Sequence, residues 1–416
     1  MGTGYVGLTT GACFAHLGHH VVCADVVAEK VEALSRGEVP ILEAGLPELV
    51  REGLGAGRLR FVLGAASAVA DCEFAFLCVP TPQGPDGAAD LSYLQAAAAE
   101  IGPLLPAEAI VVNKSTAPVG ATRVIARALR RDDVPVVANP EFLREGSAVH
   151  DFLNPDRIVI GADDQEAAMR VASLFEGINA PLIVTDPASA ETIKYASNAF
   201  LATKVSFVNA IANVCEAVGA DVREVVLGMG YDRRIGFEFL KPGPGWGGSC
   251  FPKDTRALIR TAEEAGYDFS LLRGVIAVNE EQFERVTDKI VRVAGGSVEG
   301  ATVAVWGLTF KARTDDLRDS PALEIVGRLA ERGAWVRAYD PAVRRPLDGM
   351  EVCADPYAVC EEAAVLAVLT EWDEFRWLDF DKVRELLAAP RVVDARNLLD
   401  PVALRRRGFV YEGVGR

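Results

Sequence analysis

Short apolar runs rich in valine and isoleucine alternate with alanine-rich helical stretches over the first 160 residues of the chain. This alternation predicts a parallel sheet whose strands are joined by crossover helices. The expected strands are 20–26, 74–81, 109–116, 135–142 and 157–162. A second α/β region lies near the C-terminus, with expected strands at 302–307, 334–341, 364–370 and 391–397. The pattern therefore predicts two Rossmann-like, doubly wound parallel sheets.

The region between the two sheets has a helical pattern. A run with few helix breakers extends from Ser189 to Glu216, which is longer than a typical globular helix and suits a spine that joins domains or pairs subunits. A loop rich in glycine, proline and aromatic residues is expected at 231–251, followed by helices at 253–264 and 275–293. We therefore expect three domains: a Rossmann-like domain at 1–186, a central helical dimerisation domain at 187–297, and a second Rossmann-like domain at 298–416.

The long helix has more apolar positions than a single stripe would need. These positions are Ala196, Phe200, Ala202, Val205, Phe207, Val208 and Ile211. A helix that is apolar nearly all round must be buried, and a second copy of the chain would cover its spare face. We therefore expect a homodimer or a multiple of it.

Composition narrows the possible partners. The chain has 416 residues and a formal net charge of −16, and nucleic acids and anionic membranes are both bound through basic surface. No apolar run approaches the roughly 18 residues that cross a bilayer, and no signal peptide is recognisable. The eight cysteines and four histidines show no metal-binding spacing. We therefore expect a cytoplasmic protein without a metal site, a nucleic-acid partner or a membrane partner.

A glycine motif opens the chain. Gly2, Gly4 and Gly7 form GxGxxG at the start of an expected helix, where glycines permit a tight turn and close approach of the backbone to a pyrophosphate. Asp25 closes the next strand about twenty residues later, where an acid holds the adenosine ribose and repels a 2′-phosphate. The motif alone is weak, but together with Asp25 it predicts a site for NAD rather than NADP.

The strand that should precede the glycine motif is missing, because the motif begins at residue 2. Either the start has been placed too late, or the chain is truncated. We favour the first interpretation, and expect the active protein to carry about five or six more residues, mostly Val, Ile or Ala, before Gly2.

The segment FLKPGPGWGGSCFPKDT, at 239–255, carries the most specific signal. A buried cysteine in a glycine-rich turn is one interpretation. However, Pro252 marks a helix start, which places Cys250 beside the positive end of a helix dipole, and Lys253 adds positive charge. Such surroundings lower the pKa of a thiol and make it nucleophilic. Gly247 and Gly248 would let a substrate approach the backbone.

Eight motifs in the right order resemble the UDP-glucose/GDP-mannose dehydrogenase family over nearly the whole chain. They are GTGYVGL at the start, VPTP (79–82), NKST (113–116), NPEFLREG (139–146), IKYASNAF (193–200), the 239–255 segment, GLTFKARTDDLRDSP (307–321) and TEWD (370–373). Within the family, PGPGWGGSC and TEWD look closest to the UDP-glucose 6-dehydrogenases. The resemblance implies oxidation of the C6 alcohol of UDP-glucose to a carboxylate, with NAD as cofactor.

The resemblance also implies catalytic roles. Cys250 resembles the nucleophile, and Lys194 with Asn198 resembles the pair that steadies oxyanion charge. Four further residues resemble the family's group that places water and moves protons: Thr116, Glu141, Glu145 and Asp254. Glu141 and Glu145 are four residues apart, so from the residues themselves they are equally a helix-surface pair.

Binding roles follow from the same resemblance. Implied cofactor contacts are Gly2, Gly4, Tyr5, Val6, Gly7, Asp25, Lys30, Thr81, Thr116, Glu145, Lys253 and Arg318. Implied substrate contacts are Glu141, Phe142, Leu143, Lys194, Asn198, Phe239, Leu240, Lys241, Gly247, Phe310, Lys311, Arg396 and, donated to a neighbouring subunit, Arg234. Without the resemblance, the basic residues among them would be interpreted as solvated surface.

The implied reaction removes four electrons in two steps, with a Cys250 thiohemiacetal and then a thioester as covalent intermediates. Three alternatives remain open. One is another nucleotide sugar, GDP-mannose or UDP-N-acetylmannosamine. Another is a sugar-nucleotide-binding protein without redox activity, and the third is a two-electron dehydrogenase of the hydroxyacyl-CoA or phosphogluconate type. Cys250 argues against the third, because a two-electron oxidation needs no covalent intermediate.

Overall fold

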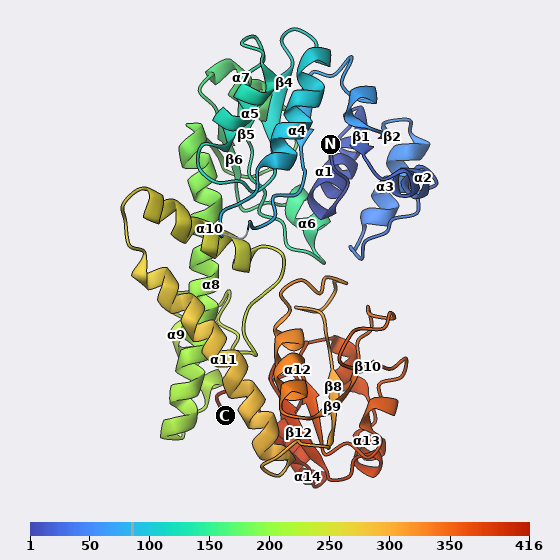
Figure 1. Ribbon diagram of the computed structural model, residues 1–416, viewed down its shortest axis with the longest axis vertical. Helices are drawn as coiled ribbons and strands as arrows, with labels where there is room; N and C mark the ends of the chain where they lie inside the picture. Colours follow the sequence, from blue (N-terminus) through green and yellow to red (C-terminus); the bar gives the residue numbers. More distant parts are fainter. Residues whose placement is uncertain (85–86) are drawn as a thin grey trace. The chain divides into compact units, whose positions relative to one another are not determined.

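The computed structural model describes residues 1–84 and 87–416, and the chain folds into two compact units (Figure 1). Unit one comprises Met1–Ser197 and Arg256–Tyr267, and unit two comprises Asn198–Thr255 and Asp268–Arg416. The boundary falls inside two continuous helices, α8 (Pro187–Val218) and α10 (Phe251–Glu264). The expected spine helix is therefore confirmed, and it extends two residues further at each end than the sequence pattern suggested.

Unit one contains a five-stranded sheet and a separate two-stranded sheet. The larger sheet has the order β3 (Phe74–Leu77), β4 (Ile110–Asn113), β5 (Val136–Ala138), β6 (Ile158–Gly161) and β7 (Leu182–Thr185). The smaller pairs β1 (Val21–Asp25) with β2 (Leu59–Leu63). The described pairs are parallel except that β5 meets β6 antiparallel, which departs from the all-parallel expectation.

Helices cover both faces of the five-stranded sheet in unit one. Alternate β4 side chains face opposite layers, because Val111 packs with α4 and α5 whereas Ile110 and Val112 pack with α1, α6 and α7. A third cluster joins α1, α2 and α3 to the two-stranded sheet. The helices are α1 (Tyr5–His16), α2 (Ala28–Ser35), α3 (Leu46–Gly55), α4 (Ser92–Ile101), α5 (Ala121–Leu129), α6 (Ala148–Leu153) and α7 (Gln165–Ser173).

The first two residues lie between the two sheets of unit one. The Gly2 N–H donates to the Ala24 carbonyl of β1 at 2.9 Å, and the Cys78 N–H donates to the Met1 carbonyl at 2.9 Å. The Met1 amino group donates to the Phe76 carbonyl of β3 at 2.8 Å. Met1 and Gly2 therefore bridge β1 and β3 at the carboxyl ends of both strands, ahead of the glycine motif.

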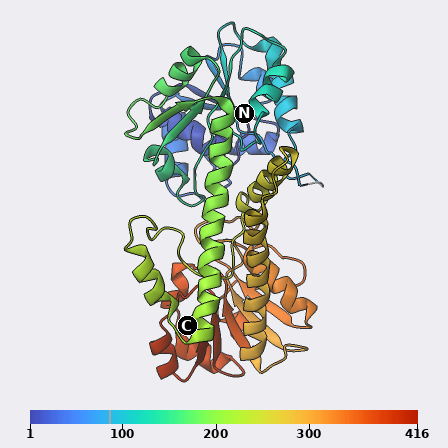
Figure 2. The same ribbon diagram turned by 90° about the vertical axis from the view of Figure 1, so that its left-hand side faces the viewer.

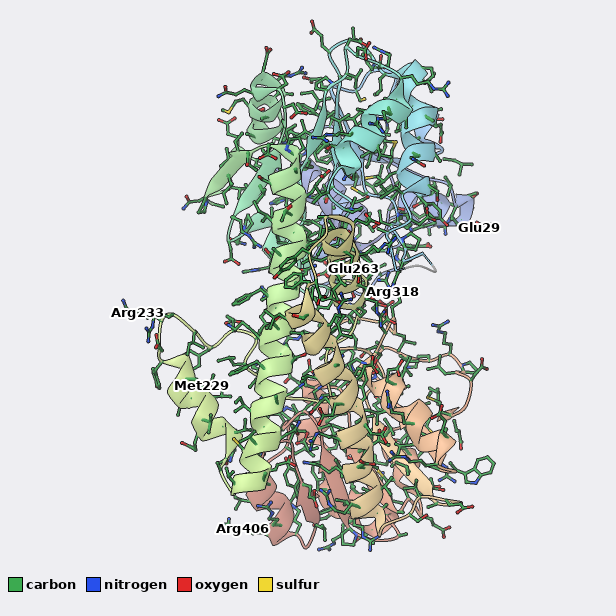
Figure 3. The ribbon with its side chains drawn as sticks, turned by 60° about the vertical axis from the view of Figure 1, so that its left-hand side comes forward. Glu29, Met229, Arg233, Glu263, Arg318 and Arg406 are labelled. Carbon is green, nitrogen blue, oxygen red and sulfur yellow. The ribbon has the colours of Figure 1, made fainter. Side chains whose placement is uncertain are left out.

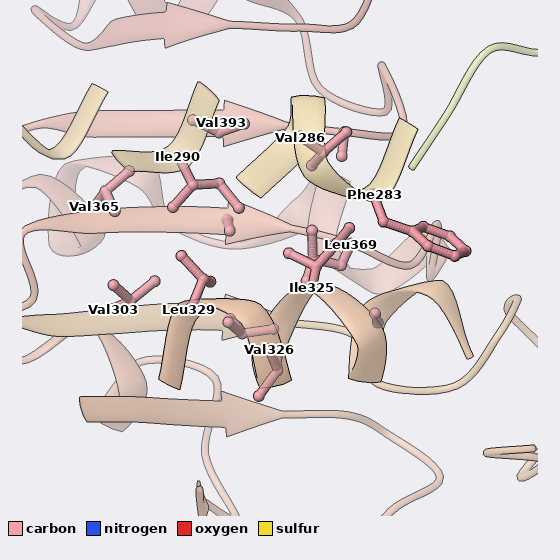
Figure 4. Close-up of a cluster of buried hydrophobic side chains, with 14 of the residues drawn as sticks. Phe283, Val286, Ile290, Val303, Ile325, Val326, Leu329, Val365, Leu369 and Val393 are labelled. Carbon is pink, nitrogen blue, oxygen red and sulfur yellow. The ribbon is translucent and has the colours of Figure 1, made fainter. Parts of the chain in front are cut away.

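Unit two contains a six-stranded parallel sheet with a Rossmann-like order. The order is β10 (Glu351–Val352), β9 (Trp335–Tyr339), β8 (Thr302–Trp306), β11 (Val365–Val368), β12 (Arg391–Asp394) and β13 (Val410–Glu412). Helices α11 (Ser270–Ala294) and α12 (Pro321–Glu331) pack on one face through the cluster shown in Figure 4. Helices α13 (Phe380–Leu386) and α14 (Pro401–Arg406) cover the other face.

The part of α8 within unit two lies beside α11 (Figure 2). The Ser206 hydroxyl donates to the Val275 carbonyl at 2.8 Å, and the Asn213 amide donates to the Gln282 side chain at 3.0 Å. After a short break, α9 (Val222–Gly230) follows α8, and the residues from 231 to 250 are loop and turn, as expected. The Cys250 loop is therefore attached to two long helices.

All nine expected strands are present, although most are shorter than their apolar runs. Four observed strands were not among those expected, and they are β2, β7, β10 and β13. β10 and β13 contain only two and three residues, too few for a periodic pattern. The fold class is confirmed: two Rossmann-like sheets accompany a long central helix.

We expect an apolar strand placed ahead of Gly2 to stabilise unit one. β1 and β3 belong to separate sheets, and a strand between them would pair backbone groups whose burial without partners costs about 1–3 kcal/mol each. Replacing Met1 by a Val- and Ile-rich segment of about six residues should raise the melting temperature and tighten NAD binding. A Gly-Ser segment of equal length is the control. Equal melting temperatures and NAD affinities for the chain with and without the apolar segment would contradict the expectation.

Candidate active site

The N-terminus of α1 has the features of an anion-binding helix start. Gly4 is its N-cap residue, in an extended conformation, and no side chain caps the first turn, which also contains no acidic residue. A Cβ atom added to Gly4 would meet nothing within 4 Å, so this side of the loop is open. The first-turn N–H groups and the helix dipole therefore favour a negatively charged group here.

The other two glycines of the motif are sterically required. Gly2 has φ +85°, and a Cβ atom there would lie 2.4 Å from the Cys78 carbonyl oxygen. A Cβ atom on Gly7 would lie 1.9 Å from the Gly2 carbonyl oxygen. The loop that begins α1 passes so close to the end of β3 that only glycine fits at both positions.

Asp25 ends β1 beside this loop. Its Oδ2 atom accepts from the Thr3 N–H at 2.8 Å and from the Thr3 hydroxyl at 2.6 Å, and lies 3.2 Å from the Lys30 Nζ. Its Oδ1 atom accepts from the Val27 N–H at 3.2 Å. Burial by itself would raise the pKa of Asp25, but these hydrogen bonds and the Lys30 charge lower it to about 2. Asp25 is therefore an anionic acceptor at neutral pH, positioned by Thr3, whose role the sequence motif did not reveal.

The segments after β3 and β4 are joined by hydrogen bonds. The Thr81 hydroxyl donates to the Thr116 carbonyl at 2.6 Å, and the Ser115 hydroxyl donates to the Val79 carbonyl at 2.8 Å. Farther along, the buried Glu191 carboxylate of α8 accepts from the Gly120 and Thr122 N–H groups at 2.6 and 2.9 Å. Thr81 and Thr116 are thus brought together at the carboxyl end of the sheet, where open α/β sheets bind ligands.

Glu141 and Lys194 form a buried ion pair in unit one. Their Oε1 and Nζ atoms are 2.8 Å apart, and each side chain is 5% exposed. The Glu141 Oε2 atom accepts from the Leu143 N–H at 2.6 Å. Burial would raise the pKa of Glu141, but the charge and hydrogen bond of Lys194 outweigh it and the pKa is lowered. Glu141 is therefore a charged partner of Lys194, with both oxygens engaged.

The residues around Glu141 and Glu145 are loop, so the alternative of a helix-surface pair is wrong. Pro140 and Gly146 flank the segment and disfavour a helix. The loop is anchored by Glu43, a residue the motifs did not single out. Its buried carboxylate accepts from the Gly146 and Ala148 N–H groups at 2.7 and 2.8 Å.

Phe142 lies close to two cations at this loop. The Arg157 guanidinium is 3.5 Å from the centre of the Phe142 ring, and the Lys194 Nζ is 5.5 Å from it. Leu143 and Glu145 are partly exposed in the same loop. The loop thus has partly exposed aromatic, aliphatic and acidic side chains beside the Glu141–Lys194 pair.

Cys250 is half-buried and immediately precedes α10 in unit two. Its carbonyl accepts from the Asp254 N–H at 2.9 Å, which makes Cys250 the first residue bonded into the helix. Its Sγ atom lies 3.5 Å from the Ser249 hydroxyl oxygen. The thiol is therefore located at the positive end of a 14-residue helix, as the sequence predicted.

Asp254 lies one helical turn beyond Cys250 and is fully buried. Its Oδ2 atom accepts from the Asn198 amide at 2.6 Å, and its Oδ1 atom lies 2.5 Å from the Lys253 Nζ. A buried carboxylate requires such partners, because its burial without them is very unfavourable. Asp254 therefore ties the helix start after Cys250 to Asn198 on α8.

Four buried polar side chains hold the loop ahead of Cys250, and sequence reasoning missed all of them. Asn209 of α8 accepts from the Gly243 N–H at 2.8 Å, and Gln282 of α11 donates to the Gly243 carbonyl at 2.8 Å. Asn279 both accepts from the Trp246 N–H and donates to its carbonyl, at 2.8 and 2.9 Å. The Ser206 hydroxyl accepts from the Trp246 indole at 2.8 Å. The only available signal was polar residues within otherwise apolar helix faces.

The glycines before Cys250 allow close packing within the chain. A Cβ atom on Gly247 would lie 1.8 Å from the Asp319 carbonyl oxygen, and one on Gly248 would lie 2.8 Å from the Phe310 ring. The Gly248 N–H donates to the Asp319 carbonyl at 3.3 Å. The close approach is therefore made by the chain's own 310–319 segment.

Phe310 and Arg396 meet near this loop in unit two. The Arg396 guanidinium donates to the Phe310 and Leu369 carbonyls at 2.8 and 2.9 Å. The Lys311 Nζ is 5.4 Å from the centre of the Phe310 ring. Leu240 is buried, and the Phe239 ring centre lies 6.3 Å from that of Phe251.

Arg318 and Arg234 are more exposed. Arg318 forms a two-point contact with Asp316, and Arg234 is 88% exposed and pairs with Asp232 in its own chain. Lys241 is also exposed. Within residues 1–84 and 87–416, no cluster of three or more His, Cys, Asp or Glu side chains has the arrangement of a metal site.

Comparison with known proteins gives one consistent family. Three profiles of the UDP-glucose/GDP-mannose dehydrogenase family match: its NAD binding domain at residues 1–179, its central domain at 188–281 and its UDP binding domain at 304–401. A UDP-glucose 6-dehydrogenase of Rhizobium meliloti is 45% identical over 430 residues, covering 100% of this chain and 98% of the relative. UDP-glucose 6-dehydrogenase TuaD of Bacillus subtilis is 45% identical, covering 100% and 92%.

Solved structures agree with this grouping. A UDP-glucose dehydrogenase from Pyrobaculum islandicum has a TM-score of 0.91 at 39% identity and covers 100% of this chain and 96% of its own. A UDP-D-ManNAc dehydrogenase from Pyrococcus horikoshii has a TM-score of 0.89 at 28% identity, covering 100% and 98%.

We expect Asp25 to make the protein prefer NAD to NADP. Its carboxylate is ionised and would repel a 2′-phosphate, and juxtaposed like charges cost several kcal/mol. Replacing Asp25 by Ala should reduce the ratio of kcat/KM for NAD over NADP by at least about tenfold, or about 1.4 kcal/mol. Asp133→Ala, which removes a different ion-paired aspartate of unit one, is the matched control. Equal use of both cofactors by the unaltered protein would contradict the role of Asp25.

Proposed function

This chain belongs to the UDP-glucose/GDP-mannose dehydrogenase family, and we propose that it oxidises the C6 alcohol of UDP-glucose to a carboxylate with NAD. The observation that carries the proposal is the position of Cys250 at the start of α10, one turn before an Asp254 bound by Asn198 and Lys253. A thiol at such a position suits covalent capture of an aldehyde, which a four-electron oxidation needs. We assign NAD binding to residues 1–186, the thiol loop to 187–297 and UDP-sugar binding to 298–416.

The protein is an NAD-dependent oxidoreductase, and its residues fit the cofactor. When bound, NAD supplies a hydride acceptor for each of the two oxidations. We assign the pyrophosphate to the N-terminus of α1, at Gly4, Tyr5 and Val6, and the adenosine ribose to the Oδ1 atom of Asp25. Further assigned cofactor contacts are Lys30, Thr81, Thr116, Glu145, Lys253 and Arg318.

Cys250 provides the covalent step. After C6 has lost one hydride and one proton, the carbon is an aldehyde. The Cys250 thiolate adds to it and forms a C–S bond while the carbonyl oxygen takes up a proton, which gives a thiohemiacetal. Loss of the second hydride and a proton converts this to a thioester. Water then adds to the carbonyl carbon and the C–S bond breaks, which releases the carboxylate and regenerates the thiolate.

Lys194 and Asn198 are assigned to the oxyanion that develops at C6. Each is held by a buried carboxylate: Glu141 holds Lys194 at 2.8 Å, and Asp254 holds Asn198 at 2.6 Å. Side chains fixed in this way need not reorganise as charge develops, and such preorganisation is often the largest contribution to catalysis.

Proton transfer and water placement are assigned to Asp254, Thr116 and Glu145. We reassign Glu141, which the family resemblance grouped with them, to holding Lys194. The lowered pKa of Glu141, caused by Lys194 despite its burial, makes it a weak base. For the substrate, we assign Phe142, Leu143, Phe239, Leu240, Lys241, Gly247, Phe310, Lys311, Arg396 and a neighbouring subunit's Arg234.

Product counting tests the function. We expect the purified protein to form two NADH for each UDP-glucose consumed. One NADH per sugar would indicate a two-electron dehydrogenase, and none would indicate a binding protein without redox activity. Faster turnover of GDP-mannose or UDP-N-acetylmannosamine would assign a different nucleotide sugar. The 45% identity to relatives named UDP-glucose 6-dehydrogenase favours UDP-glucose among these.

We expect Cys250→Ser to stop turnover and leave UDP-glucose affinity nearly unchanged, because the hydroxyl is a much weaker nucleophile than a thiolate. Calorimetric titration measures the affinity and NADH absorbance measures turnover. Cys353→Ser, at another partly buried cysteine of unit two, should keep the activity. NADH formation by Cys250→Ser at the unaltered rate would remove the thioester mechanism.

We also propose a cytoplasmic homodimer, or a multiple of it, that covers the exposed face of α8. Phe200, Phe207, Val214 and Val218 are between 50% and 71% exposed on this helix. On α9 and the segment after it, where Figure 3 shows Met229 and Arg233, Leu227, Tyr231 and Phe237 are also exposed. Among the described helices, α8 has the length and composition of a membrane span. However, its Glu191, Lys194 and Asn198 are buried and paired within the protein, which favours a protein partner over lipid.

We expect Phe200→Glu combined with Phe207→Glu to lower the mass measured by light scattering to that of one chain, because charges at an apolar interface are strongly unfavourable. Trp335→Glu, at a 72% exposed tryptophan on β9, is the control and should leave the mass unchanged. A fully active protein of monomeric mass before any substitution would refute the dimer.

A further inference from the structure

A buried lysine of unit one has no part in the reaction assigned above. Lys114 directly follows β4 and is 4% exposed. Its Nζ atom donates to the Asn139 Oδ1 atom at 3.1 Å. The rings of Phe152 and Phe175 lie 5.8 and 6.0 Å from the Nζ atom, within range of a cation–π contact. Lys114 is therefore enclosed by one amide and two aromatic rings.

The amide of Asn139 has a fixed orientation. Its Nδ2 atom donates to the Val159 carbonyl of β6 at 2.9 Å, so its Oδ1 atom faces Lys114. The Asn139 N–H in turn donates to the Asn113 carbonyl at 2.9 Å, and the Lys114 N–H donates to the Leu77 carbonyl at 3.0 Å. Three neighbouring strands therefore determine where the Lys114 ammonium lies.

Lys114 and Asn139 line the same cavity as Glu141, Phe142 and Arg157. Burial lowers the pKa of Lys114, and the charge of Glu141 opposes that effect. Conversely, the Lys114 charge adds to the effect of Lys194 on the pKa of Glu141. The charged and titratable groups around this carboxylate and lysine are Lys194 of α8, Arg157 and Asp156 of the segment before β6, Cys78 after β3, and Cys13 of α1.

We propose that Lys114 is a positioning residue for the Glu141–Lys194 pair, because its buried ammonium is a second cation at the same cavity and keeps Glu141 ionised as the partner of Lys194. The proposal rests on the proposed function, in which Lys194 stabilises the oxyanion. The Glu141 carboxylate lies 2.8 Å from the Lys194 Nζ atom and lines one cavity with Lys114, so this buried cluster contains one carboxylate and two lysines. With a neutral residue at 114, the pair would be neutral overall and Glu141 would take up a proton more readily.

The carboxylate titration of Glu141 tests the proposal without depending on activity. Protein labelled with 13C at the glutamate carboxyl carbon is titrated by NMR, and Glu141→Gln identifies the resonance. In Lys114→Met we expect the titration midpoint to move to higher pH by about one unit, the lower end of the effect of a nearby opposite charge. Lys114→Arg, which keeps the charge, should restore a midpoint close to that of the unaltered protein.

Lys289→Met is the matched control. Lys289 is 6% exposed in unit two, where it pairs with Glu216, so its loss also removes a buried ammonium but at a different place. This variant should leave the Glu141 midpoint unchanged. An unchanged midpoint in Lys114→Met would overturn the proposal. Where Lys114→Met does not fold, Lys114→Gln, whose amide can still bond to Asn139, provides the same comparison.

The pH profile of kcat provides the second measurement. In Lys114→Met its acidic limb should move by the same amount, which lowers the rate about tenfold at pH values below the limb, while KM for UDP-glucose changes little. A uniform fall in kcat without displacement would indicate a merely structural role and overturn the proposal. Absence of NADH from the unaltered protein would remove the proposed function instead, and the NMR titration would still decide the role of Lys114.

Discussion

Buried carboxylates that must be paired are the constraint on which the candidate site depends. Glu141 and Asp254 are both buried, and each carboxylate would be very unfavourable in the interior without a cation or a strong donor. Each carboxylate therefore determines where its partners lie: Lys194 for Glu141, and Asn198 with Lys253 for Asp254. The energetic penalty of leaving a buried charge unpaired is thus used to orient the donors of the proposed reaction.

The loop ahead of Cys250 is likewise held by buried polar groups that need partners, but here the groups are neutral. A loop of glycine and proline has little side-chain packing of its own, so its backbone must be held by other elements. Asn209, Asn279 and Gln282 satisfy the Gly243 and Trp246 backbone groups from two long helices. Buried polar groups of this kind are costly only when unsatisfied, and here they fix one loop conformation ahead of Cys250. The candidate site therefore depends on α8 and α11, because these helices carry the amides that hold the loop.

The sequence motifs identified the residues of the candidate site, but they did not predict which other side chains hold those residues in place. Valine-rich runs identified strands such as β4 and β8, because a buried parallel strand is apolar on both faces. The motifs also led to Cys250, Lys194 and Asn198. Helical periodicity, however, does not reveal which polar residue of a helix faces inward, so Asn209 and Asn279 were missed. The spacing of Glu141 and Glu145 suggested a helix that Pro140 and Gly146 prevent, and Thr3 and Glu43 were missed because their partners are 22 and about 100 residues away.

Each of the two Rossmann-like sheets has an aspartate at the end of a strand, and the two aspartates differ in how fully the protein itself uses their oxygens. In each, the aspartate accepts hydrogen bonds from a glycine-containing loop: Asp25 from Thr3 ahead of α1, and Asp340 from Leu308 and Thr309 after β8. Asp340 is fully buried, and it also accepts from the Trp372 indole and the Ala342 N–H, so both of its oxygens are used within the protein. Asp25 keeps an Oδ1 atom that accepts only a 3.2 Å bond from Val27. In the proposed function this oxygen is the acceptor assigned to the adenosine ribose, whereas both oxygens of Asp340 are already engaged within the protein.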